Sequence, residues 1–237
     1  MTGVEMVIVL VAAAAGGAVQ GTTGIGLTLV AGPLLFSIDP AFAPGPLIAV
    51  GLLVSTRHVV VEGAHVDRHG LGRFLLGAPV GIVLGLLVLT SVSERAMALL
   101  VGGAVVVASL AVLSGRHPRR TDRALVTGGG ITAFSSISAG LPGPPVVIVF
   151  HDAPPPTLRS TTAAFLILLA VPTLTLLALV GEFGRHELGL TVRLAPGLLA
   201  GLVLSRWLRP VVDRAWFRPL VLGLAAAGGA VLVLRNL

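Results

Sequence analysis

The stretch Val4–Ile38 decides the fold and reads VEMVIVLVAAAAGGAVQGTTGIGLTLVAGPLLFSI. It is apolar almost throughout, but residues 20–26 form a polar, glycine-rich middle. As one straight helix of 35 residues it would be about 52 Å long, whereas the hydrocarbon core of a bilayer is about 30 Å thick. Because three glycines within six residues favour a turn over a helix, we expect a break near Gly21–Gly26.

The second half of the chain carries a similar interruption. Residues 128–145 read GGGITAFSSISAGLPGPP. A shift of 116 residues, which is close to half the chain, places Gly24 on Gly140 and also aligns three further pairs: Gly26 with Pro142, Gln20 with Ser136, and Pro40 with Pro156. Interrupted apolar segments at corresponding places in two halves are typical of a transporter binding site. The sequence therefore predicts two related halves.

Composition indicates an integral membrane protein. Of the 237 residues, 55% are hydrophobic and 11% are charged, against about 25% charged in soluble domains. Long apolar runs, in place of the roughly ten-residue alternating segments of a barrel, predict membrane-spanning helices. The basic residues are all arginines and cluster in short loops, which is typical of membrane topology rather than of nucleic-acid binding. The chain has no cysteine, so disulfides, thiolate catalysis and Cys-ligated metals are excluded.

Eight apolar segments are predicted, in an all-α membrane protein of two pseudo-symmetric halves of four segments each. Residues 1–115 form the N-terminal half, 116–123 a basic connecting loop, and 124–237 the C-terminal half. The first and fifth segments are expected to be broken, or to enter and leave the membrane on the same side. The eight predicted segments are Val4–Ile38, Pro46–Val61, Leu71–Thr90, Ala96–Ser114, Ala124–Phe150, Thr161–Val180, Leu188–Leu204 and Trp216–Leu234.

The arginines distinguish two topologies. If every segment crosses once, the side of the termini holds ten arginines and the other side six. If the first and fifth segments are re-entrant, twelve arginines gather on the side of the connecting loop. The remaining four are then Arg95, Arg185, Arg193 and Arg235. The second arrangement has the sharper positive-inside bias and makes the halves inverted repeats, so the sequence favours it.

Three stretches of the chain resemble motifs of a known family. Residues 20–35, QGTTGIGLTLVAGPLL, resemble the first motif of the sulfite exporter TauE/SafE family of membrane transporters. Residues 138–147, SAGLPGPPVV, followed by PTLR at 156–159, resemble its second motif, and AHVDR at 64–68 resembles its link between the second and third segments. Pro142 departs from this pattern, because a glycine is expected there.

The resemblance implies a transporter of small anions in the cell (inner or plasma) membrane. Sulfite, sulfonates and related sulfur-containing or organic anions are the implied substrates, moved by alternating access around paired broken helices. The expected partners are this anion and the lipid bilayer. Assembly into a homo-oligomer is left undecided. No nucleic acid, cofactor or metal is expected. A passive anion channel, an intramembrane enzyme and an accessory subunit remain as alternatives.

The candidate substrate-binding residues lie at the two breaks. Broken helices expose backbone N–H groups and a positive dipole end, which bind oxyanions. Glycines would let the backbone approach the anion, while hydroxyls and an amide would donate hydrogen bonds; the alternative is that these small residues only allow close helix packing. The predicted set is Gln20, Thr22, Thr23, Gly24, Gly26, Ser136, Ser138, Gly140, Pro142 and Gly143, together with Arg159 and Arg57 as possible anion contacts.

The histidines give little support to an enzyme or a metal site. All six are predicted at segment ends or in loops, so no histidine base faces a serine inside the membrane. His65 and His69 have a spacing that binds metals on helices, but no carboxylate pattern completes a site. Glutamates are scattered at segment ends, unlike the clustered acids of a phosphatase. The sequence therefore predicts no catalytic residue.

Overall fold

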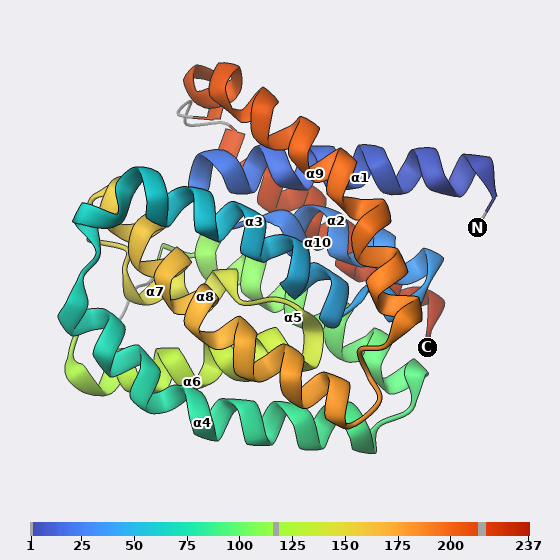
Figure 1. Cartoon of the computed structure of the whole chain (residues 1–237), viewed down its shortest axis with the longest axis horizontal. Helices are drawn as coiled ribbons and strands as arrows, with labels where there is room; N and C mark the ends of the chain where they lie inside the picture. Colours follow the sequence, from blue (N-terminus) through green and yellow to red (C-terminus); the bar gives the residue numbers. More distant parts are fainter. Residues whose placement is uncertain (1, 116–118, 213–216) are drawn as a thin grey trace.

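The computed structural model describes residues 2–115, 119–212 and 217–237, and within them all regular secondary structure is helical (Figure 1). Residues 116–118 of the predicted connecting loop, and Trp216 at the predicted start of the eighth segment, lie outside the described residues. The described helices are α1 Gly3–Thr23, α2 Leu27–Ile38, η1 Pro40–Phe42, α3 Gly45–Glu62, η2 Gly63–His65, α4 Arg68–Ser91, α5 Glu94–Leu113, α6 Asp122–Ala139, α7 Gly143–Val149, α8 Pro155–Leu179, α9 Arg185–Val212 and α10 Phe217–Arg235.

Both predicted breaks are present. The first long segment divides into α1 and α2, and the fifth divides into α6 and α7. Six stretches among the described residues are long and apolar enough to cross a membrane: Gly3–Thr23, Pro40–His65, Arg68–Ser91, Glu94–Leu113, Pro155–Leu179 and Arg185–Leu208. The helices of the predicted second, third and fourth segments begin and end within three residues of the expected bounds.

Local capping explains where several helices begin. Side-chain oxygens of Thr2, Asp67, Ser93 and Thr121 each accept a backbone N–H from the first turn of the helix that follows, which stabilises a helix start. The α8 helix begins six residues before the predicted Thr161, at Pro155. Proline is tolerated in the first turn of a helix because that N–H has no helical partner, so the proline run starts the helix instead of delaying it.

Each broken segment folds back on itself. The α2 helix begins beside Gly16, where a Cβ would lie 2.9 Å from the Leu27 carbonyl oxygen, and it then runs back along α1 (Figure 1). The α7 helix likewise ends beside α6: a Cβ on Gly128 of α6 would lie 2.8 Å from the side chain of Val149, the last residue of α7. The two breaks therefore lie at the tips of two helical hairpins.

Helices that precede residue 116 pack against helices that follow residue 123. The α1 helix packs along α9, and α6 packs along α4, so each broken segment lies against a helix from the other half. The α3 helix packs against α8, and α5 packs against α10. Exchanging the halves reproduces this set of pairs. Glycines allow the close approach: a Cβ on Gly17 would lie 2.8 Å from the Leu198 carbonyl oxygen, and one on Gly85 would lie 2.9 Å from that of Phe134.

The two termini lie at the same end of the molecule (Figure 1). The side chain of Arg95, at the start of α5, donates to the backbone carbonyl of Asn236 at 2.6 Å, and His186, at the start of α9, contacts Asp39 after α2 at 3.0 Å. The connections before α4, α6 and α8 lie at the opposite end (Figure 1). We call it the arginine-bearing end, because Arg68 begins α4, Arg119 and Arg120 precede α6, and Arg159 lies near the start of α8. Large apolar side chains on α1, α4, α8 and α9 face outward, among them Val7, Val80, Val171 and Leu199, as expected of a surface in contact with lipid.

Candidate functional site

One glutamine side chain caps the helix that follows the first break. The chain leaves α1 through Gly24, which has φ +83°, and enters α2 through Gly26, which has φ +127°. Positive φ angles of this size favour glycine over other residues. The side-chain oxygen of Gln20 accepts the N–H of Leu27 at 3.1 Å. Gln20 thus caps the N-terminus of α2 from the last turn of α1. The N–H groups of Thr28 and Leu29 lie in the same first turn, where no helical partner exists.

The second break has the same backbone plan but fewer donors. Gly140 ends α6 with φ +64°, as Gly24 ends α1. Pro142 occupies the cap of the seven-residue helix α7, as Gly26 does for α2. Pro144 and Pro145 follow Gly143 in the first turn of α7, and proline has no N–H to donate. The second break therefore offers far less hydrogen-bonding capacity to an anion than the first.

The two breaks meet inside the protein. A Cβ on Gly143 would lie 3.1 Å from the Cβ of Ile25, which stands between the two glycines of the first break. Two adjoining cavities lie at this meeting point. The larger has a volume of about 40 Å³ and is lined by Gln20, Leu27, Thr28, Leu47, Ile48, Gly51, Leu52, Ser136, Gly140, Pro142, Leu166, Leu169 and Ala170. The smaller, about 20 Å³, is bordered by Gly24, Gly26 and Gly143 and shares four residues with the larger: Gln20, Thr28, Pro142 and Leu166.

Three polar side chains border the larger cavity. Gln20, Thr28 and Ser136 are buried, with 7%, 8% and 3% of their surfaces exposed. The Gln20 oxygen is occupied by Leu27, which leaves its amide nitrogen as a donor. In the described part of the chain, this nitrogen and the hydroxyls of Thr28 and Ser136 have no hydrogen-bond partner within the protein. The fully buried hydroxyls without a partner are instead those of Ser109, Thr162 and Thr173. Because these donors border a cavity, they can bind a ligand that accepts hydrogen bonds.

Among the described residues, none that lines the cavity is charged. Its electrostatic character comes from the neutral donors and from the positive end of the α2 dipole, which favours an anion. No Asp or Glu of the described ranges borders the cavity, so none repels an anion there. A negative ligand is therefore the kind that this lining favours.

Several residues predicted for the site point elsewhere. The hydroxyls of Thr22 and Thr23 donate to Val19, and that of Ser138 donates to Phe134, each within its own helix. None of the three borders either cavity. Arg57 is half-buried in α3, which continues past it to Glu62. Arg57 also borders neither cavity.

Arg159 lies beside the first break, paired with a carboxylate. Its Nε and Nη2 donate to the two oxygens of Glu62 at 2.8 and 2.7 Å. Its stem covers Gly24, where a Cβ would lie 2.8 Å from the Arg159 Cγ. Sequence reasoning missed Glu62 because it lies 97 residues from Arg159. It also missed Thr28, although Thr28 stands two residues after Gly26 within the quoted motif.

His58 corrects an expectation about the histidines. It was predicted at a segment end, but it lies inside α3 with 2% of its surface exposed. Its Nε2 is 3.2 Å from the backbone carbonyl oxygen of Gln20, and a carbonyl only accepts, so Nε2 carries the proton. His58 thus supports the last turn of α1.

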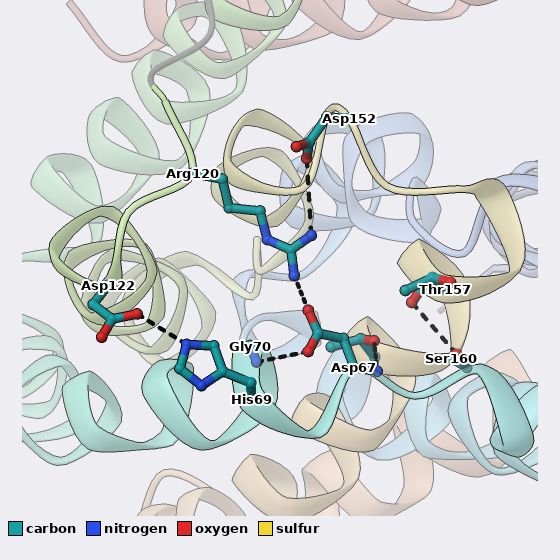
Figure 2. A network of polar contacts seen from close by, with 9 residues as sticks. Asp67, His69, Gly70, Arg120, Asp122, Asp152, Thr157 and Ser160 are labelled. Carbon is teal, nitrogen blue, oxygen red and sulfur yellow. Dashed lines mark hydrogen bonds and ion pairs between the residues drawn. The ribbon is translucent and has the colours of Figure 1, made fainter.

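A further ion network joins the loops at the arginine-bearing end (Figure 2). Arg120, from the connecting loop, pairs with Asp67 and lies 3.9 Å from Asp152, and its guanidinium stacks over Phe150. Asp122 pairs with His69 and Arg73 at 2.9 and 2.8 Å. These contacts tie the α3–α4, α5–α6 and α7–α8 connections together. In the described ranges no group of three or more His, Cys, Asp or Glu residues could hold a metal ion.

Comparison with known proteins decides the family. The model of the sulfite exporter TauE/SafE family matches residues 8–232, which include both breaks and the whole cavity lining. The chain belongs to the sulfite exporter TauE/SafE family. As a TauE/SafE member it is a multi-pass membrane protein of a transporter family, and membership implies export of sulfite or a related small anion. No curated protein and no solved structure matches the chain.

Proposed function

We propose that this chain carries sulfite or a related small sulfur-containing anion across the cell membrane, and that the cavity between the two breaks is the substrate site. The observation that supports it best is the cluster of Gln20, Thr28 and Ser136, whose unpartnered donors border one buried cavity. Family membership and the α2 dipole point to the same class of ligand.

The cavity volume favours a compact ligand. About 40 Å³ gives room for about three water molecules, since one water needs about 10–15 Å³. A sulfite ion, with a single sulfur and three oxygens, suits this space better than a long-chain sulfonate. Its three oxygens would accept from the Gln20 amide and from the hydroxyls of Thr28 and Ser136. Such hydrogen bonds to a charged ligand are stronger than those between neutral groups.

Alternating access is the mechanism that suits the hairpins. We infer that α1–α2 and α6–α7 enter the membrane from opposite sides as re-entrant hairpins of two inverted halves, 1–115 and 124–237. The corresponding caps Gly24 and Gly140 and the exchangeable helix pairs support this proposal. The arginine-bearing end would then face the cytoplasm. Rocking of one half against the other would expose the cavity to each side in turn.

Counterflow tests the proposal without knowledge of the coupling ion. The purified chain is reconstituted in vesicles that are loaded with unlabelled sulfite, and ³⁵S-sulfite is added outside under anaerobic conditions. A carrier makes the tracer rise transiently above its equilibrium level, whereas a channel only equilibrates it. The expected result is an overshoot that empty vesicles lack. Simple equilibration would favour the channel, and no uptake of sulfite would contradict the proposed function.

A further inference from the structure

Glu62 and Arg159 form the most buried ion pair in the described part of the chain. Their side chains are 13% and 16% exposed, whereas those of Asp67 and Arg120 are 20% and 24% exposed, and those of Arg73 and Asp122 are 40% and 52% exposed. Both carboxylate oxygens of Glu62 accept from the guanidinium, at 2.7 and 2.8 Å. This two-point geometry is the one by which arginine binds planar carboxylates and other oxyanions.

The ion pair stands directly behind the cavity wall. Gly24 separates the stem of Arg159 from the smaller cavity, which Gly24 borders. His58 lies one helical turn before Glu62 on α3, and it contacts the carbonyl oxygen of Gln20, whose side chain borders both cavities. Arg159 is therefore a cation next to a cavity whose described lining residues are uncharged.

An anion leaving the cavity on this side meets a site that is already filled by a carboxylate. A buried guanidinium needs a negative partner, because an uncompensated buried charge is strongly unfavourable. A small oxyanion presents the same pair of acceptor oxygens as Glu62, so it can take the place of the carboxylate without leaving the arginine unpaired. Glu62 is the last residue of α3, and the η2 turn follows it directly.

We propose that Glu62 is the resting counter-ion of Arg159 and that the transported anion displaces it, which makes Arg159 the next binding station between the cavity and the arginine-bearing end. This inference rests on the proposed function. The inference assigns Glu62 a role in substrate affinity. Glu62 competes with the anion for Arg159 and so keeps the affinity of this station low enough for release. A purely structural ion pair would have no effect on anion affinity.

Removal of the competing carboxylate tests this role. Sodium sulfite binding to the purified full chain is measured by titration calorimetry and by thermal shift, at constant ionic strength. We expect Glu62→Gln to lower the dissociation constant about tenfold, the size of effect typical of a hydrogen bond to a charged group. The double variant Glu62→Gln/Arg159→Gln should lose this gain. Asp122→Asn, which breaks an exposed ion pair at the same end, is the matched control and should bind as the wild type does.

Each outcome bears on the proposal. If Glu62→Gln does not fold, Glu62→Asp shortens the carboxylate by one methylene and should tighten sulfite binding in the same direction. Equal dissociation constants for the wild type and the Glu62 variants would overturn the displacement step and leave the proposed function standing. If the wild type binds sulfite and shows counterflow, the proposed function stands, and the Glu62 variants then test the displacement step alone. A wild type that binds no sulfite would overturn both.

Discussion

The imidazole of His58 lies 3.2 Å from the backbone carbonyl oxygen of Gln20, and so joins α3 to the last turn of α1. The side chain of the same glutamine caps α2 and borders the larger cavity. One residue of the first break therefore connects three helices, and α3 fixes its position. The packing of α3 against α8 extends this connection to the segment that carries Arg159.

Replacing His58 tests whether it positions Gln20. We expect His58→Leu to raise the KM for sulfite several-fold and to lower stability by about 1 kcal/mol, the usual contribution of one hydrogen bond. His58→Gln keeps an N–H donor and should restore most of the wild-type KM. Sulfite flux into vesicles and thermal unfolding provide the two readouts. An unchanged KM in His58→Leu would show that the contact does not control the site.

Gln20→Glu separates helix capping from anion binding. The carboxylate keeps an oxygen that can accept the Leu27 N–H, so the α2 cap, which is worth about 0.5–2 kcal/mol, should persist. The same change replaces a donor in the cavity with a negative charge, which repels an anion. We expect a folded protein whose sulfite flux falls more than about tenfold. Wild-type flux in Gln20→Glu would place the anion elsewhere.

The hydroxyls offer two matched comparisons. Thr28→Val and Ser136→Ala remove donors that border the cavity, whereas Thr22→Val and Ser138→Ala remove hydroxyls that bond within their own helices. We expect the first two to weaken sulfite binding about tenfold each, since a hydrogen bond to a charged ligand is worth about 1.5–3 kcal/mol. The second two should bind sulfite as the wild type does. Dissociation constants by calorimetry check this, and equal losses in both pairs would contradict the assigned lining.

Local features were predictable from the sequence and distant contacts were not. The breaks at Gly24 and Gly140 follow from the conformational freedom of glycine at single positions, so both could be placed by pattern. The partners of Arg159 and His58 are set by tertiary packing between segments far apart in the chain. Thr28 was missed because it resembles any residue of an apolar helix, and only the folded chain brings its hydroxyl to the cavity.

The left-handed backbone at Gly24 predicts a specific sensitivity. Gly24→Ala places a Cβ at φ +83° and 2.8 Å from the Arg159 stem, and such a conformation costs a non-glycine residue about 1–2 kcal/mol. We expect a lower unfolding temperature and reduced sulfite flux. Gly103→Ala in α5 is the control: a Cβ there meets nothing within 4 Å, and alanine stabilises a helix by about 0.5–1 kcal/mol relative to glycine. Equal effects of both changes would contradict this account of the break.

Single cysteines test the re-entrant arrangement, because the chain has no cysteine of its own. Arg119 and Glu182 are exposed in the connections before α6 and before α9. If α1–α2 and α6–α7 are re-entrant, the two positions lie on opposite sides of the membrane. An impermeant maleimide added to intact cells should then label Glu182→Cys and leave Arg119→Cys unlabelled until the cells are opened. Labelling of both on one side would favour the topology in which every segment crosses once.

The most direct test of the substrate site is to locate a bound anion. Crystals of the wild type grown with selenite, a heavier analogue of sulfite, would be measured at the selenium absorption edge. The account predicts an anomalous peak in the cavity bordered by Gln20, Thr28 and Ser136. A selenite peak only at the protein surface, in a preparation that transports sulfite, would contradict it.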